Sequence, residues 1–242
     1  MLEKFKELIL KDKTQPLVTK VPHHLAITLD GIKAYADATK ISLADAYTTS
    51  FDLIKKVIRT QISWNIPILS LGVLSEQLKN EPEEFTIAVD HLKSFLSQLK
   101  KDSLLHKNKV KISVLGKWYD LPGSLVEEIK DIIELTKDYD QFFVNLCINY
   151  GGQEEILDSC KLIGRMVKAD KLDPDAITKD LVKENLYSSY FLPPDLIIKT
   201  SHETIPDLLL WDISHAKIYF AKKEWPALKK SDITKAINHF RS

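Results

Sequence analysis

The sequence has little cysteine, no excess of charge of either sign and no long apolar run, and each absence excludes a class of protein. Its two cysteines, Cys147 and Cys160, have neither metal-ligand spacing nor the pattern of a disulfide framework, so we expect both to be reduced, buried thiols. The 34 basic residues equal the 34 acidic residues, which gives no long-range attraction to nucleic acid or to an anionic membrane. We therefore expect no nucleic-acid partner and at most peripheral membrane contact.

No stretch rich in Gly, Ser and Pro interrupts the chain, so we expect a single domain over residues 1–242. Residues 1–13 form an amphipathic segment with charges throughout, which is unlike a signal peptide or a membrane span. With 44% hydrophobic and 28% charged residues the chain can bury a core, and we expect a cytoplasmic protein.

Apolar runs of strand length alternate with longer segments of helical period, which is typical of a parallel sheet covered by helices. We predict strands at 24–30, 67–73, 110–115, 142–149, 195–199 and 217–221. Helices are predicted at 43–64, 82–101, 123–136, 154–169, 174–185 and 231–241. The predicted fold is an α/β domain with a central six-stranded, mostly parallel sheet.

Ligands of such sheets bind at the carboxyl ends of the strands, where loops and helix N-termini meet. Four polar segments are predicted there: Asp30-Gly31, Ser75, residues 149–152 and Lys199-Thr200. A tight turn is the commoner explanation of an Asp-Gly pair or of two glycines after a strand. Spacing alone therefore indicates only a weak site.

Four blocks give a more specific indication: HLAITLDG at 24–31, NLCINYGGQEEI at 145–156, PDLIIKTSHE at 194–203 and LLLWDISHAKIYFAKKEWPAL at 208–228. Together they resemble the cis-prenyltransferase family, which includes undecaprenyl and dehydrodolichyl diphosphate synthases. Block order and spacing agree over nearly the whole chain, apart from one short deletion near Ile205. The resemblance implies the cis-prenyltransferase fold.

The resemblance also implies a chemistry, the condensation of isopentenyl diphosphate with an allylic diphosphate in the presence of Mg²⁺, while the product enters an apolar tunnel. Two polyanionic diphosphates must lie side by side, so such a site needs arginine forks, backbone N–H groups and a metal-binding carboxylate. By resemblance, Asp30 is the retained catalytic and metal-binding position, with Mg²⁺ as cofactor if the chain is active and no cofactor otherwise.

Several other family positions are retained or nearly so. Gly31, Ser75, Thr200 and Glu203 match the family pattern, and all are expected to bind substrate. Lys199 replaces a family arginine and keeps its charge without the bidentate fork. Lys33 is a displaced substitute for the arginine of the family's Asp-Gly-Asn-Gly-Arg-Trp block.

Many diphosphate-binding positions differ from the family. Ile32 replaces the family's asparagine after Asp-Gly, and the following Gly-Arg becomes Lys33-Ala34. Further family Arg, His, Asn, Arg and Glu positions align with Leu43, Tyr47, Leu78, Glu81 and Lys217. At roughly 1.5–3 kcal/mol for each charged contact, losing about four costs on the order of 6–12 kcal/mol of diphosphate binding. We also expect Lys217 to lie beside Asp30 and to repel a divalent cation.

These differences favour one hypothesis over two others. The first is a catalytically silent subunit that pairs with a catalytic homologue in a heteromeric polyprenyl or dolichyl diphosphate synthase. The family's silent subunits end in Arg-x-Gly, whereas this sequence ends in Asn-His-Phe-Arg-Ser, so Arg241 would have to substitute. The alternatives are an active divergent prenyltransferase and an isoprenoid-binding module without chemistry.

The family pairs through the region that corresponds to residues 199–225, and this segment is strongly apolar here. Pairing with a homologue or with a second copy of the chain is predicted through its apolar side chains, Leu208, Leu209, Leu210, Trp211, Tyr219 and Phe220.

Overall fold

Six apolar segments form one parallel sheet, whose strand order is β3-β4-β2-β1-β5-β6. The computed structural model of the protein describes residues 21–241. Strand β1 is buried along its whole length, as expected for a parallel strand covered on both faces. The strands are β1 (His24–Thr28), β2 (Ile68–Ser75), β3 (Val110–Leu115), β4 (Phe142–Tyr150), β5 (Leu196–Thr200) and β6 (Lys217–Ala221).

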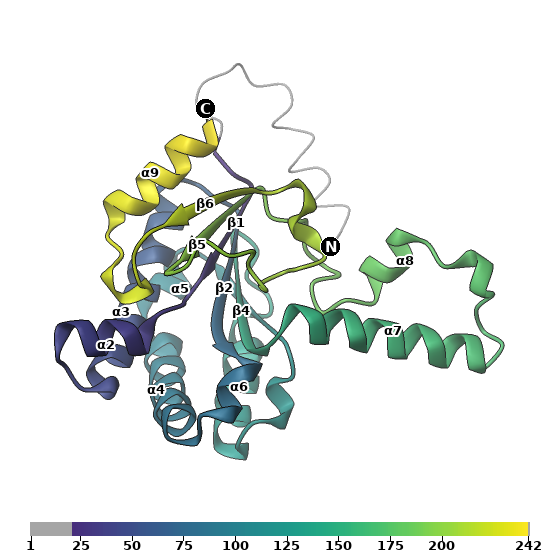
Figure 1. Ribbon diagram of the computed structural model, residues 1–242, viewed down its shortest axis with the longest axis horizontal. Coiled ribbons are helices and arrows are strands. Elements are labelled where there is room, and N and C mark those ends of the chain that lie inside the picture. Colours follow the sequence, from purple (N-terminus) through teal and green to yellow (C-terminus); the bar gives the residue numbers. More distant parts are fainter. Residues whose placement is uncertain (1–20, 242) are drawn as a thin grey trace.

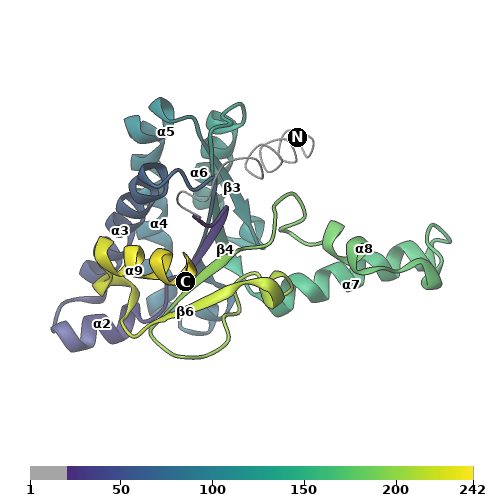
Figure 2. The same ribbon diagram turned by 90° about the horizontal axis from the view of Figure 1, so that it is seen from above.

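One face of the sheet is covered by helices that bury the larger core (Figures 1 and 2). Their apolar residues recur at helical spacing and so face the sheet or a neighbouring helix. In one such contact, Phe51 of α3 stacks on Phe95 of α4 with ring centroids 5.1 Å apart. The helices that contribute to this core are α2 (Ile32–Thr39), α3 (Leu43–Ser63), α4 (Pro82–Lys101), α5 (Ser103–Lys107), α6 (Gly123–Thr136) and α9 (Lys230–Arg241).

The opposite face is covered mainly by irregular chain rather than by long helices. Leu208 and Leu209 pack there against Ala26 and Ile197, and the segment around Tyr187 and Phe191 borders the same smaller core. Helices α7 (Gly152–Lys168) and α8 (Lys179–Glu184) leave this side and project as an arm (Figures 1 and 2).

The structure confirms the predicted fold class and all six strands. The prediction of one helix over 174–185 is wrong, because Pro174–Ala176 forms a 3₁₀ turn and α8 restarts at Lys179 behind the side-chain cap of Thr178. Helices α2 and α5 were not predicted.

Two further predictions concern single regions of the chain. Cys147 is buried as expected, whereas Cys160 is exposed on α7, so the prediction that both thiols are buried is wrong. The amphipathic segment at residues 1–13 lies outside the described residues. Of the helices within residues 21–241, none is long and apolar enough to cross a membrane.

Candidate active site

Asp30 lies just beyond the carboxyl end of β1, as predicted. The strand order reverses here, because the chain moves from β1 to β2 on one side and later returns to β5 on the other. The Asp30 N–H donates to Thr200 Oγ1 at 2.9 Å, and the Asp30 carbonyl accepts from the Trp225 N–H at 2.9 Å. The backbone of Asp30 is therefore fixed between β5 and the turn that follows β6.

Lys199 points from β5 at the Asp30 carboxylate. Its Nζ donates to Asp30 Oδ2 at 2.7 Å, and the Lys199 side chain is only 9% exposed, compared with 43% for Asp30. A buried ammonium needs such a partner, since an unpaired charge in this position is costly. The two retained charges of the site therefore neutralise each other.

A cleft of about 240 Å³ opens above this ion pair. Among the side chains that line it, Asp30 and Asp207 carry negative charge and Lys199 carries positive charge. The cleft contains no arginine, although all three arginines of the sequence lie in the described part of the chain. Arg59 lies near Asp102, Arg165 is on α7, and Arg241 packs over the ring of Trp64.

The cleft brings together three of the predicted site residues. Asp30, Ser75 and Lys199 line it, and Thr200 supports it from below through its bond to Asp30. Lys33 is exposed on the first turn of α2 and does not line the cleft. Glu203 pairs instead with Lys222 at 2.9 Å.

Gly31 has a positive φ of 83°, a conformation that glycine adopts without strain. A Cβ at this position would meet Glu224 Cγ at 2.9 Å and Ser201 Oγ at 3.0 Å. The space beside Gly31 is therefore filled by the side chains of Glu224 and Ser201.

The expectation that Lys217 lies beside Asp30 within the chain is wrong. Lys217 begins β6 and pairs in register with Leu196 at the start of β5, and Leu196 pairs with Leu25 near the start of β1. Asp30 lies five residues beyond Leu25, about 16 Å along the strand direction. Lys217 is thus at the opposite end of the sheet.

Asp207 was not predicted as a site residue, yet it occupies a characteristic anion position. Its Oδ2 accepts from the N–H of Gly152, the first residue of α7, at 2.9 Å. Helix N-termini attract anions because their N–H groups lack partners within the helix. The one hint in the sequence was the short deletion that the family resemblance implied near Ile205, in the loop that carries Asp207.

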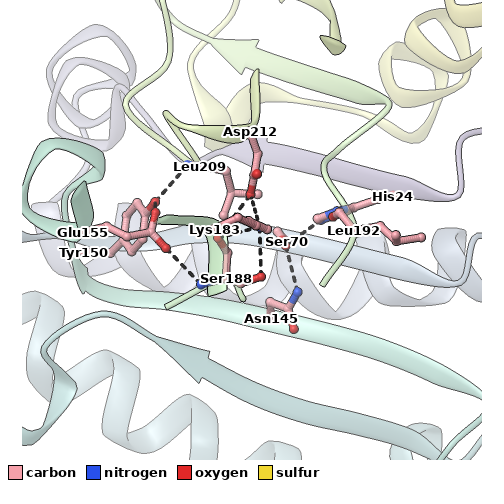
Figure 3. Close-up of polar contacts among 10 residues, drawn as sticks. All are labelled: His24, Ser70, Asn145, Tyr150, Glu155, Lys183, Ser188, Leu192, Leu209 and Asp212. Carbon is pink, nitrogen blue, oxygen red and sulfur yellow. Dashed lines mark hydrogen bonds and ion pairs between the residues drawn. The ribbon is translucent and has the colours of Figure 1, made fainter. Parts of the chain in front are cut away.

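Below the cleft, the base of the arm is tied to the sheet by a buried polar network, shown in Figure 3. Tyr150 donates to Glu155 Oε2 at 2.5 Å and accepts from the Leu209 N–H at 3.0 Å, while Glu155 Oε1 accepts from the Ser188 N–H at 2.9 Å. Burial raises the pKa of Glu155 and of Tyr150, so Tyr150 remains a proton donor.

A second part of the network joins the arm to the following loop. Lys183 Nζ lies 2.5 Å from Asp212 Oδ2, and the Ser188 hydroxyl donates to the same carboxylate oxygen at 3.1 Å. Asp212 is buried, with its side chain 4% exposed. This network is therefore a buried, mutually bonded set of charges.

His24 completes the polar contacts of Figure 3 on the sheet itself. Its Nδ1 donates to the Leu192 carbonyl at 2.6 Å, which leaves Nε2 to accept from the Ser70 hydroxyl at 2.8 Å. Burial lowers the pKa of His24 to about 4, so the ring is neutral. His24 therefore has a structural role, because it fixes the segment that precedes β5 to the sheet.

The donor set of one chain does not suit Mg²⁺. Among the described residues, no group of three or more His, Cys, Asp or Glu side chains is arranged to hold a metal ion. The Asp30 carboxylate is engaged by an ammonium, and the Asp207 carboxylate is engaged by the α7 N-terminus. A divalent cation prefers several free carboxylate or carbonyl oxygens.

The predicted pairing residues fall into two groups. Leu208 and Leu209 are buried in the smaller core of the chain itself, at 4% and 1% exposed. Phe220 is 37% exposed, and Leu210, Trp211 and Tyr219 are half-buried. Only the second group presents surface to another molecule.

Comparison with known proteins agrees with this fold. A family model described as "Putative undecaprenyl diphosphate synthase" matches residues 28–242. A tritrans,polycis-undecaprenyl-diphosphate synthase (geranylgeranyl-diphosphate specific) of Thermoplasma volcanium is 33% identical over 91% of this chain and 86% of its own length. An isoprenyl transferase of Staphylococcus saprophyticus is 31% identical over 98% of this chain and 96% of its own.

Among solved structures, the lavandulyl diphosphate synthase of Lavandula x intermedia in complex with dimethylallyl diphosphate has the same fold. It superposes with a TM-score of 0.86 at 24% identity and covers 91% of this chain and 95% of its own. The family match, the relatives and the cleft at the end of β1 lead to one conclusion. The chain belongs to the undecaprenyl diphosphate synthase family of cis-prenyltransferases.

Proposed function

We propose that this chain is a catalytically silent member of its family that acts as the non-catalytic subunit of a heteromeric polyprenyl or dolichyl diphosphate synthase. The observation that carries the proposal is the Asp30–Lys199 ion pair in a cleft without arginine. The remaining charged side chain of the cleft is Asp207, so the cleft has an excess of negative charge. A site that binds two diphosphates requires an excess of positive charge.

The surroundings of the cleft support the same proposal. Tyr47, which stands where the family has a histidine, is buried and donates to Glu84 at 2.9 Å. Glu81, which stands where the family has an arginine, is the N-terminal flanking residue of α4. Tyr47 therefore serves the fold, and neither position offers a positive charge to a phosphate.

The arm and the β6 edge give the chain surface for a partner. The arm exposes three apolar side chains, Leu157 and Leu162 of α7 and Ile177 before α8, each about 40% exposed. Phe220 adds an apolar side chain on β6, an edge strand of the sheet. The proposed partner is a catalytic homologue with the intact Asp-Gly-Asn-Gly-Arg block, since the relatives named above are synthases.

The activity experiment uses purified full chain with Mg²⁺, labelled isopentenyl diphosphate and either farnesyl or geranylgeranyl diphosphate. We expect no polyprenyl product from the chain alone, while a homologue with the intact block serves as the positive control. Product from the chain alone that is abolished by Asp30→Ala would show an active divergent prenyltransferase and overturn the proposal.

The pairing experiment co-purifies the chain with a homologue that carries the intact Asp-Gly-Asn-Gly-Arg block and measures complex formation by sedimentation. We expect Leu162→Glu to weaken the complex, because it places a charge in an apolar contact, and the matched Lys168→Glu on the same helix to leave it unchanged. No complex at all would contradict the subunit role, whereas a complex that tolerates both changes would place the pairing on the β6 edge instead of the arm.

A further inference from the structure

The Lys199 ammonium bonds to two oxygen atoms of the kinds that bind a divalent cation. Its Nζ donates to Asp30 Oδ2 at 2.7 Å and to the Thr200 carbonyl oxygen at 3.3 Å. Carboxylate and carbonyl oxygens are the ligands that hard cations such as Mg²⁺ and Ca²⁺ select in proteins. The ammonium therefore occupies a position beside Asp30 that offers oxygen ligands to a cation.

The residues that carry these oxygens are held in place by contacts that do not involve Lys199. The Thr200 N–H donates to Thr28 Oγ1 at 3.0 Å, and the Thr200 hydroxyl donates to the Thr28 carbonyl at 2.9 Å. The Asp30 backbone is bonded to Thr200 through its N–H and to Trp225 through its carbonyl. Loss of the ammonium would therefore leave both residues where they are.

Burial makes the ammonium a permanent occupant of this position. The Lys199 side chain is 9% exposed, and moving it off the Asp30 carboxylate would leave a charge unpaired in a nearly buried position. The Asp30 side chain is 43% exposed and lines the cleft, so ions in solution can reach its carboxylate. The ammonium, and not a lack of access, therefore excludes a metal ion.

The charges that line the cleft agree with this role. Asp30 and Asp207 carry negative charge, and Lys199 carries positive charge. A divalent cation added to this lining would give three positive charges against two negative charges, and the ammonium would repel it at the shared carboxylate. Without Lys199, the same cation would give two positive charges against two negative charges.

We propose that Lys199 is a built-in substitute for the divalent cation that the family resemblance implies, and that its ammonium excludes metal ions from the cleft. The inference rests on the proposed function and deepens it, because it assigns the loss of the metal site to one residue. An uncharged residue in place of Lys199 should therefore give the cleft a cation site. It should not give a diphosphate site, which needs several positive side chains.

The first test compares Lys199→Met with the matched control Lys33→Met, which removes the same charge from the exposed first turn of α2. Mn²⁺ is added to each full chain, and its site is located by paramagnetic broadening of backbone amide NMR signals. The signals to follow are those of Asp30, Gly31 and Thr200. In Lys199→Met they should broaden at a Mn²⁺ concentration about tenfold or more below that needed in the wild-type chain and in Lys33→Met. Equal broadening in the three chains would overturn the proposal.

The second test adds Asp30→Asn to Lys199→Met. This change removes the carboxylate that would hold the ion, so the selective broadening should disappear. Broadening that survives in the double variant would place the ion elsewhere and overturn the proposal. Lys199→Gln, which is also uncharged and keeps a polar end on the side chain, provides the same comparison if Lys199→Met does not give the spectrum of a folded chain.

Both tests use neither substrate nor partner, so their outcome is separate from that of the product assay. Selective broadening around Asp30 in a wild-type chain that makes no product would overturn this inference and leave the proposed function standing. Product from the wild-type chain alone would instead overturn the proposed function.

Discussion

The cleft at Asp30 and the buried network at the base of the arm lie on the same sheet and differ in what constrains them. In the network, Glu155, Ser188 and Asp212 are buried, and they bond to one another and to the partly buried Lys183. In the cleft, Asp30 is 43% exposed and bonded to Lys199, and no arginine is among the lining residues. Side chains that bind only a ligand can be lost without affecting folding, whereas buried bonded charges cannot.

This comparison predicts the largest loss of stability for Asp212→Ala. The change leaves the Lys183 ammonium without its carboxylate, and breaking a buried ion pair costs about 3–5 kcal/mol of unfolding free energy. Lys183 keeps its bonds to Ser188, so we expect about 3 kcal/mol by urea denaturation. As a control, Glu127→Ala breaks an exposed pair with Lys130 and should cost less than about 0.5 kcal/mol. A loss below about 1 kcal/mol for Asp212→Ala would remove the distinction between network and cleft.

The next effect is a dependence of stability on pH through His24. Burial lowers its pKa from 6.5 to about 4, so between these values the unfolded chain binds a proton that the folded chain does not. Stability from this group is therefore lost as pH falls below 6.5, by about 2 kcal/mol at pH 5. Burial raises the pKa of Glu155, which acts in the opposite direction, so the measurement is the difference between the wild-type chain and His24→Gln. Parallel pH curves for the two chains would show that His24 is not buried as a neutral ring.

The smallest effects are expected in the cleft, and they should be asymmetric. Asp30→Asn leaves the nearly buried Lys199 ammonium with a weaker partner and should cost about 1 kcal/mol. Lys199→Met leaves an exposed carboxylate that water can solvate, and should change stability by less than about 0.5 kcal/mol. Thermal unfolding of both variants tests the asymmetry. Equal large losses of stability in the two variants would show that the cleft contributes to folding as the buried network does.

The fold was predictable because its signals are local. Each strand is a short apolar run, and each long helix has an apolar stripe and a recognisable start, such as Ser42 before α3 or Pro82 at the start of α4. The helix at Ile32–Thr39 was missed because it begins directly after Gly31 with no side-chain cap. Its apolar residues are also too few to show a clear period.

The site was predictable only in part, because its contacts join distant residues. The strand pattern placed Asp30 and Lys199 at the same edge of the sheet, but it did not indicate that these side chains, 169 residues apart, would bond to each other. The expected position of Lys217 was wrong because a family motif gives a residue's alignment and not the end of the strand at which it lies. Asp207 was missed because its role depends on the path of a loop.

The contact between Asp207 and the α7 N-terminus also limits what a single substitution could change in the cleft. A Cβ on Gly152 would meet the Asp207 carbonyl oxygen at 2.1 Å, so the loop and the helix start are packed against each other in their present form. An arginine introduced into the cleft would leave this carboxylate on the helix N-terminus and the Asp30–Lys199 pair closed. Under the proposed function, one substitution is therefore not enough to give the cleft a diphosphate site, because both carboxylates are already held by partners within the chain.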